Sequence, residues 1–432
     1  MTKARWCTLL TVLLCCSACS APSLRHKKEV NKHLASNDFI AAQQSIEKSR
    51  TKEYSRKDSL LYALDVGAVL HDGGMEADSD KHFAYAQDRI DELFTKSLSA
   101  YTARYLINDL TAPYQPAPYE RVLTYYYRAM NFLSQGRIGD ALVEANRAVY
   151  YLDHLRDGKK SGWREDPFVQ YFMSLVFESA GKRDDARIAR ARASQAAPAI
   201  VQALRLPVPP ADYGEVILVH ANGVVPLKKS QTFQVAWGDV FLWLNDPREQ
   251  ANTVSPEIQN AISAGLLGNA ITVAYPVVSE QPFEIQSSEV ITQQGESYPT
   301  SLLGDVAGSM KTDLKEKEAG TLFRLAIRAA SKRVAAVQAK HAAARSSQQE
   351  YVGDLAAMLV SFLGALTEKA DTRQWFTLPA QLRLARFYVP AGTQDITLRF
   401  RNGFGKIVGE YTFKDVAVPA GGRVYLHHRT AK

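Results

Sequence analysis

The four cysteines are the side chains whose chemistry the sequence constrains most tightly. They are Cys7, Cys15, Cys16 and Cys19, and residues 20–432 contain none. If the chain is cut before Cys19, the mature protein keeps a single thiol. One thiol cannot form an internal disulfide. The sequence therefore predicts a mature protein without a disulfide.

Residues 1–18 have the layout of an export signal. Lys3 and Arg5 precede an uncharged apolar run from Trp6 to Cys16, and two small residues then precede Cys19. The run is far shorter than the ~20 residues that cross a bilayer as a helix. The motif "CSAC" resembles the bacterial lipobox, in which the cysteine receives lipid and becomes the mature N-terminus.

This resemblance implies that Cys19 carries acyl chains such as palmitate and is followed by a lipid-anchored linker at 19–29. Cys16 departs from the lipobox, which usually has leucine at that position. Ser20, rather than aspartate, follows Cys19, and in the resembling lipoproteins this implies the outer membrane. Each buried CH₂ contributes about 0.8 kcal/mol, so several chains would anchor the protein persistently. The alternative is an ordinary secretory signal cut near Ala18.

No other motif predicts a reaction. The sequence contains no HExxH, paired CxxC, GxxxxGK[ST] or GxSxG motif. His427 and His428 are adjacent on an expected strand, so their side chains should point to opposite faces and make a poor metal pair. Asp371 and Arg373 are expected to pair in a structural role near Trp375. We therefore predict a protein that is not an enzyme, with no catalytic residue, no metal and no cofactor.

The composition is typical of a globular protein. Hydrophobic residues make up 46% of the 432 positions, charged residues 22%, and the formal net charge is +7. This length allows two or three domains. Without Lys3 and Arg5 the 52 basic side chains fall to 50, against 45 acidic ones. A mild positive charge favours anionic lipid or polymer surfaces, and nucleic acid is not an expected partner of an exported protein.

Residues 30–200 predict an array of helical hairpins, because apolar side chains recur there at helical spacing. In two stretches a glycine is followed by alanine five residues later and by a second alanine after seven more. These residues are Gly136, Ala141 and Ala148, and Gly181, Ala186 and Ala193. Glycine permits the turn and alanine allows two helices to approach closely. The spacing resembles the tetratricopeptide repeat (TPR), with ordinary helix packing as the alternative.

Stacked repeats of this kind present a concave groove that binds a peptide or a partner protein. On the TPR resemblance, Tyr126, Met130, Tyr171 and Glu178 face the groove and are candidate partner-binding residues. The alternative for each tyrosine is packing between helices.

A proline-rich linker at 201–214 separates this array from a predicted mixed α/β domain at 215–432. Within that domain, about 310–345 has helical spacing and places Arg324, Arg328 and Lys332 four residues apart. This basic strip would face lipid headgroups or an acidic partner, or would be a solvated outer face.

Residues 382–432 alternate in polarity and contain the motif "VPAG" twice. Proline cannot join a ladder and glycine adopts turn conformations, so each motif is expected to connect two strands of a small antiparallel, sandwich-like sheet. The predicted fold class is therefore α+β, with an N-terminal TPR-like helical array and a mixed α/β domain that ends in this sheet.

Several longer motifs resemble a family of largely uncharacterised bacterial lipoproteins with tetratricopeptide-like repeats. They are "YQPAPYERVLTYYYRAMNFL", "VHANGVVPLKK", "AYPVV" and "TEKADTRQWFTLPAQLRLARFYVPAG". The resemblance implies envelope proteins as partners, among them small lipoproteins, one of which is similar to the curli-secretion channel protein. It assigns no catalytic role to any of these residues.

These observations favour a non-enzymatic adaptor, anchored through Cys19 to the periplasmic face of the outer membrane, that joins proteins of a cell-envelope complex. Two alternatives stay open. One is an enzyme that acts on peptidoglycan or polysaccharide through residues 215–432. The other is a structural subunit of a secretion or motility apparatus.

Overall fold

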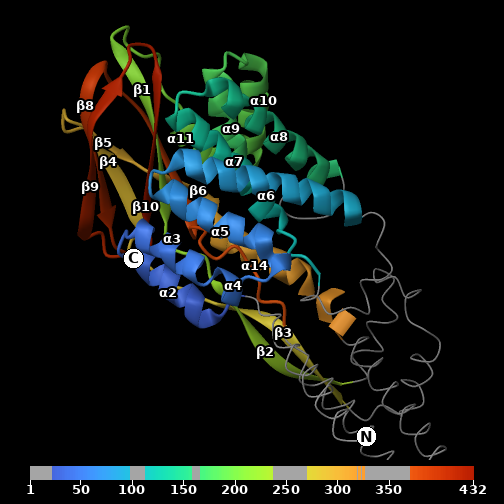
Figure 1. The fold of residues 1–432 in the computed structure, drawn as a ribbon. Helices are drawn as coiled ribbons and strands as arrows, with labels where there is room; N and C mark the ends of the chain where they lie inside the picture. The colour runs from blue at the N-terminus through green and yellow to red at the C-terminus, as the bar shows by residue number, and fades with distance from the viewer. Residues whose placement is uncertain are drawn as a thin grey trace, which may run out of the picture.

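The computed structural model describes residues 22–97, 112–157, 166–236, 270–318, 320–322, 324–325 and 370–432. It has an α+β fold, with helices in the N-terminal half and largely antiparallel sheets in the C-terminal part (Figure 1). Cys19 lies outside the described residues. Among the described helices, none combines the length and the apolar character that crossing a bilayer requires.

The N-terminal half consists mainly of antiparallel helical hairpins. Its helices are α2 (Leu24–Ala35), α3 (Phe39–Lys48), α4 (Arg50–Glu53), the 3-10 helix η2 (Arg56–Asp58), α5 (Ser59–Asp72), α6 (Glu76–Ser97), α7 (Pro118–Ser134), α8 (Ile138–Asp157), α9 (Pro167–Ser179), α10 (Arg183–Ala196) and α11 (Pro198–Ala203). The α5–α6, α7–α8 and α9–α10 turns contain Gly74, Gly136 and Gly181, with φ of 72°, 71° and 73°. Residues with a side chain are strained in this left-handed region, which explains why glycine occupies these positions. The predicted turns at Gly136 and Gly181 are confirmed.

Small residues bring the paired helices together, as their spacing predicts. Ala141 and Ala148 of α8 and Ala186 and Ala193 of α10 are all buried. Successive hairpins also contact each other, α6 against α7 and α8 against α9. The array therefore has one inner face that another layer must cover.

Two four-stranded sheets form the rest of the fold. The strands are β1 (Tyr213–Asn222), β2 (Leu227–Ala236), β3 (Ala270–Ser279), β4 (Ser287–Ile291), β5 (Ser297–Pro299), β6 (Ser301–Asp305), β7 (Gln381–Pro390), β8 (Gly392–Arg401), β9 (Ile407–Val418) and β10 (Arg423–Thr430). The first sheet has the order β10-β1-β7-β6, and the second has the order β5-β4-β8-β9. Only the β1–β10 pair is parallel among the described pairs, and β2 and β3 form a separate hairpin.

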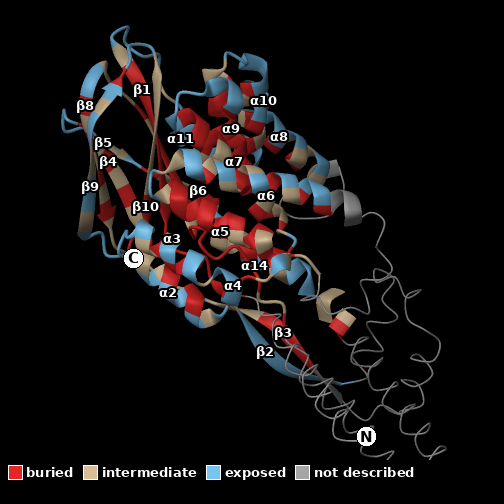
Figure 2. Cartoon of the chain, in the orientation of Figure 1, coloured by how far each residue is buried: buried red, intermediate tan, exposed pale blue. Residues whose placement is uncertain are grey.

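Strand β1 shows how the layers are built. Ile217 and Val219 point into the core shared with the helices, whereas Val216 and Leu218 point into a second core against the other sheet. Neighbouring side chains of a strand face opposite sides, so a strand that is apolar throughout needs cover on both faces. The helices cover one face of the β10-β1-β7-β6 sheet and the β5-β4-β8-β9 sheet covers the other (Figure 2).

The two "VPAG" motifs connect strands as predicted, but the strands they join lie in different sheets. The first lies between β7 and β8, and the second between β9 and β10. Ala391 N–H donates to Asp212 O at 2.8 Å, and Gly421 N–H donates to Tyr213 O at 2.9 Å. Both motifs are thus corners of a sandwich, held by the residues that lead into β1, and not hairpin turns within one sheet.

A single buried core crosses the predicted linker at 201–214. Leu64 and Phe172 of the helices share it with Leu384 of β7. Val201 and Leu204, within the predicted linker, are themselves buried. The inner face of the helical array is therefore covered by the protein's own sheet.

The segment 370–380 lies buried between the helices and the sheet. Arg373 and Asp371 form the predicted ion pair at 2.7 Å, and Arg373 also bonds to Asp58 of η2 at 3.0 Å. The backbone N–H of Trp375 donates to Glu120 Oε1 of α7 at 3.0 Å. Irregular backbone can be buried here because helix carboxylates satisfy its donors.

The predicted basic helical segment at about 310–345 is only partly described. Helix α14 (Val306–Glu316) forms its start. The positions of Arg328 and Lys332 lie outside the described residues.

Candidate functional site

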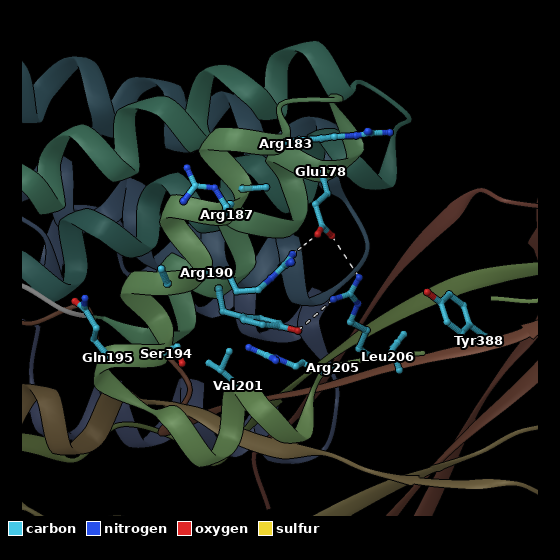
Figure 3. Close-up of a pocket in the computed structure, with 14 residues that line it drawn as sticks. Glu178, Arg183, Arg187, Arg190, Ser194, Gln195, Val201, Arg205, Leu206 and Tyr388 are labelled. Carbon is cyan, nitrogen blue, oxygen red and sulfur yellow. Dashed lines mark hydrogen bonds and ion pairs between the residues drawn. The ribbon is translucent and has the colours of Figure 1, made fainter. Parts of the chain in front are cut away.

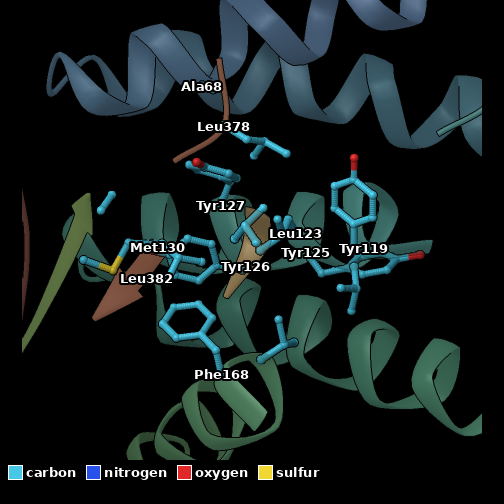
Figure 4. Packing of buried hydrophobic residues seen from close by; sticks show 14 of the residues in the cluster. Ala68, Tyr119, Leu123, Tyr125, Tyr126, Tyr127, Met130, Phe168, Leu378 and Leu382 are labelled. Carbon is cyan, nitrogen blue, oxygen red and sulfur yellow. The ribbon is translucent and has the colours of Figure 1, made fainter. Parts of the chain in front are cut away.

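The predicted groove residues Tyr126 and Met130 lie inside the protein. Both are 0% exposed, and they pack among Phe168, Leu378 and Leu382 (Figure 4). Leu382 belongs to β7, so the sheet occupies the face that was expected to bind a partner. This corrects the prediction for these two residues, because a partner would have to displace the sheet to reach them.

Tyr171 and Glu178 instead line one open cleft of about 710 Å³. Its walls are α9, α10 and α11 on one side and β7 on the other. The lining residues are Tyr171, Glu178, Arg183, Ala186, Arg187, Arg190, Ala191, Ser194, Gln195, Val201, Arg205, Leu206, Arg386 and Tyr388. The Tyr171 ring is buried and its hydroxyl donates to Leu204 O at 3.2 Å, so Tyr171 forms the floor of the cleft. Its predicted exposure to a partner is therefore also corrected.

Glu178 is the centre of a charge network that fixes the cleft. It pairs with Arg190 of α10, with Arg386 of β7 at 3.3 Å and with Arg423 of β10 at 3.0 Å. Arg386 and Arg423 also share Glu215 of β1. Burial alone would raise the pKa of the Glu178 carboxyl, but the bond and charge of Arg190, with the charges of Arg386 and Arg423, bring it below its usual value. Glu178 is thus a structural anion in this network.

Three further arginines of the cleft are not neutralised in this way. Arg183 and Arg205 are exposed and have no side-chain partner among the described residues. Arg187 has only Asp184 at 3.7 Å, with both side chains largely in water. A pair of this kind contributes little. Figure 3 shows Arg183, Arg187 and Arg205 around the central Glu178–Arg190 pair.

The chemistry of this surface is anion binding. The planar guanidinium donates two parallel hydrogen bonds to a carboxylate or a phosphate, and several arginines around one concave surface bind such groups cooperatively. Among the residues that line the cleft there is no cysteine and no histidine, and the one carboxylate is already paired.

Part of this site was readable in the sequence. Arg183, Arg187 and Arg190 follow i, i+4, i+7 spacing, which places them on one face of a helix. Arg205 and Arg386 come from a loop and from a strand 181 positions later in the chain, and only the packing of β7 against α9 brings them to the same cleft.

A second constellation involves His427, which the sequence singled out. His427 and His428 do point to opposite faces of β10, as predicted. His428 stacks on Tyr411 with ring centroids 4.0 Å apart, whereas His427 lies 4.3 Å from the ring of His71. His71, Asp72 and His427 offer ligand atoms within 4.8 Å of one another. No local pattern indicates this set, because His71 and Asp72 end α5, far from β10 in the chain.

Comparison of the chain with protein-family models, with curated proteins and with solved structures finds no match. The lipoprotein family that the sequence motifs resemble therefore stays a prediction.

Proposed function

We propose that the protein is a non-enzymatic adaptor of a bacterial cell envelope, which binds an acidic segment of a partner protein in the arginine-lined cleft. On this proposal, lipid on Cys19 anchors the chain to the periplasmic face of the outer membrane. The helical hairpins are tetratricopeptide-like repeats that serve as a rigid scaffold for the cleft.

The observation that carries the proposal is the cleft itself. It is concave, lies between two rigid layers, and presents Arg183, Arg187 and Arg205 without strong internal partners. Extended acidic segments suit such a surface, because carboxylates spaced along a peptide can meet successive guanidinium groups. The network around Glu178 holds Arg190 and Arg386 in place, so little side-chain entropy is lost there on binding.

Reversing the charge of the cleft is expected to abolish partner capture. In Arg183→Glu/Arg187→Glu/Arg205→Glu, three cationic contacts become repulsive, so affinity should fall at least about tenfold. A photo-crosslinker at Ser194, inside the cleft, would identify the bound segment by mass spectrometry of intact envelopes. We expect one discrete protein, crosslinked through a segment rich in aspartate and glutamate.

The matched control is Arg25→Glu/Arg56→Glu/Arg137→Glu, which changes the net charge equally at exposed positions outside the cleft. It should retain the crosslink. Capture of nothing but abundant porins, or an unchanged crosslink in the cleft variant, would contradict the proposal. Turnover of cell-wall fragments by the purified protein would favour the enzymatic alternative.

The anchor is tested separately by replacing the proposed lipidation site. Cys19→Ser is expected to leave the protein in the soluble periplasmic fraction or to block processing, and to lose the added mass of the acyl chains. Cys16→Ser removes a neighbouring thiol within the signal and should leave membrane attachment intact. Membrane-bound Cys19→Ser protein with the same mass as the wild type would disprove the anchor.

A further inference from the structure

The set His71, Asp72 and His427 lies where the helical half meets the last strand. His71 and Asp72 are the final two residues of α5, and His427 is on β10. His427 Nε2 is 3.6 Å from Asp72 Oδ1. Two ligands of a tetrahedral zinc ion, each about 2.0–2.1 Å from the metal, lie roughly 3.3 Å apart. The observed spacing is therefore close to that of a metal site.

The atoms of this set that could bind a metal are buried. Among the described residues, His71 Nε2, His427 Nε2 and Asp72 Oδ1 make no hydrogen bond, whereas Asp72 Oδ2 is paired with Arg429. The Asp72 side chain is 1% exposed, and that of His427 is 10% exposed. Leaving a buried polar atom unpaired is destabilising, and more so for a charged group. Several such atoms aimed at one another call for a ligand between them.

A chain of hydrogen bonds fixes which nitrogen of His71 is free. His71 Nδ1 is 2.6 Å from Asn131 Oδ1, and Asn131 Nδ2 donates to Ser79 Oγ at 2.9 Å. Ser79 Oγ in turn donates to Gly67 O at 2.8 Å. The Asn131 amide is thereby oriented with its oxygen toward His71, so Nδ1 carries the proton. The lone pair is left on Nε2, which is how a metal-binding histidine is usually held.

Arg429 completes the surroundings. Its Nε lies 3.1 Å from Asp72 Oδ2, whereas His427 Nε2 is nearest to the other oxygen, Oδ1. Oδ2 is thus held by the guanidinium, and Oδ1 is left for a metal. The positive charge of Arg429 weakens the attraction for a divalent cation, so the two neutral imidazoles must supply much of the affinity. Nitrogen ligands favour zinc over magnesium or calcium, which prefer oxygen.

We propose that His71, Asp72 and His427 bind a zinc ion that ties α5 to β10. Water or hydroxide would supply the fourth ligand. Since β10 is the last strand and an edge of its sheet, the ion would fix the C-terminal end of the chain to the helical half. This inference is independent of the cleft and of the lipid anchor.

The test uses the full-length mature protein, with its metal removed by chelation and then restored. Zinc should bind with a stoichiometry of about one and raise the melting temperature by at least ~3 °C, whereas magnesium should not. Cobalt in place of zinc should give the visible absorption of a tetrahedral site. His71→Gln and His427→Gln should each reduce bound zinc at least tenfold.

The matched control is His428→Gln, next to His427 on the opposite face of β10. It should bind zinc like the wild type. Zinc binding that persists in His71→Gln and His427→Gln would overturn the proposal. If those variants do not fold, the wild-type stoichiometry and cobalt spectrum decide the question, and no zinc binding by the wild-type protein would equally overturn it.

Discussion

Replacing Glu120 with alanine is expected to destabilise the protein by about 3–5 kcal/mol. The Glu120 carboxylate is buried and accepts a hydrogen bond from the Tyr114 hydroxyl at 2.5 Å. It also accepts from the backbone N–H groups of Ala117 at 2.7 Å and Trp375 at 3.0 Å. Without it, these buried donors lose their common acceptor, and segment 370–380 loses its hydrogen bond to Glu120 of α7. Urea unfolding followed by circular dichroism would measure the change.

The control for this variant is Asp140→Ala, which removes an exposed carboxylate at the start of α8. Among the described residues, Asp140 pairs with exposed Arg137, which directly precedes α8. Its loss should change the free energy of unfolding by no more than about 0.5 kcal/mol. If Glu120→Ala were as stable as Asp140→Ala, the carboxylate would not hold the buried segment.

Replacing Lys27 with methionine is expected to stabilise the protein near pH 7 and to change how its stability depends on pH. The Lys27 side chain is buried and its Nζ donates to Thr372 O at 2.7 Å. Burial, and then the charge of Lys228, lower the pKa of Lys27 from 10.5 to about 7. Methionine has a similar length and carries no amine that must lose its proton when it is buried.

The sign of the pH effect follows from proton binding. Between about pH 7 and 10.5 the unfolded chain holds the Lys27 proton and the folded chain does not. The unfolded state therefore binds more protons, and the stability contributed by Lys27 rises with pH and is lost as pH falls toward 7. The slope is at most about 1.4 kcal/mol per pH unit.

Lys27→Met should lack this rise, so the stability difference between the variant and the wild type should shrink from pH 7.5 to 9.5. Lys28→Met, at the exposed neighbouring position, should keep the wild-type slope. Other titrating groups are common to all three proteins, so the comparison isolates Lys27. Equal slopes in the wild type and Lys27→Met would show that the buried amine keeps its proton.

Local chemistry explains the parts of the fold that could be predicted. The left-handed turns at Gly136 and Gly181 and the buried alanines near them follow from sterics within a few residues. The opposite orientations of His427 and His428 follow from the period of a strand. The "VPAG" motifs were correctly predicted as connections, but their local sequence does not specify whether a corner stays in one sheet or enters another.

The partner-binding prediction failed for Tyr126 and Met130 because helical periodicity identifies an apolar face without identifying what covers it. A groove that binds a partner and a groove filled by the same chain require the same apolar side chains. Here β7 fills the groove, and Leu382 joins the same buried cluster as Met130, which lies 252 positions earlier in the chain.

The sequence by itself determined the helical hairpins of the first half, their turns and the strands within 382–432, because each depends on propensities and spacings within a few residues. It also predicts an export signal at residues 1–18 and the lipidation of Cys19. Only the tertiary structure decided the arginine-lined cleft and the set His71, Asp72 and His427. Both join side chains from distant segments, and their meeting depends on how whole layers pack, which no local pattern encodes.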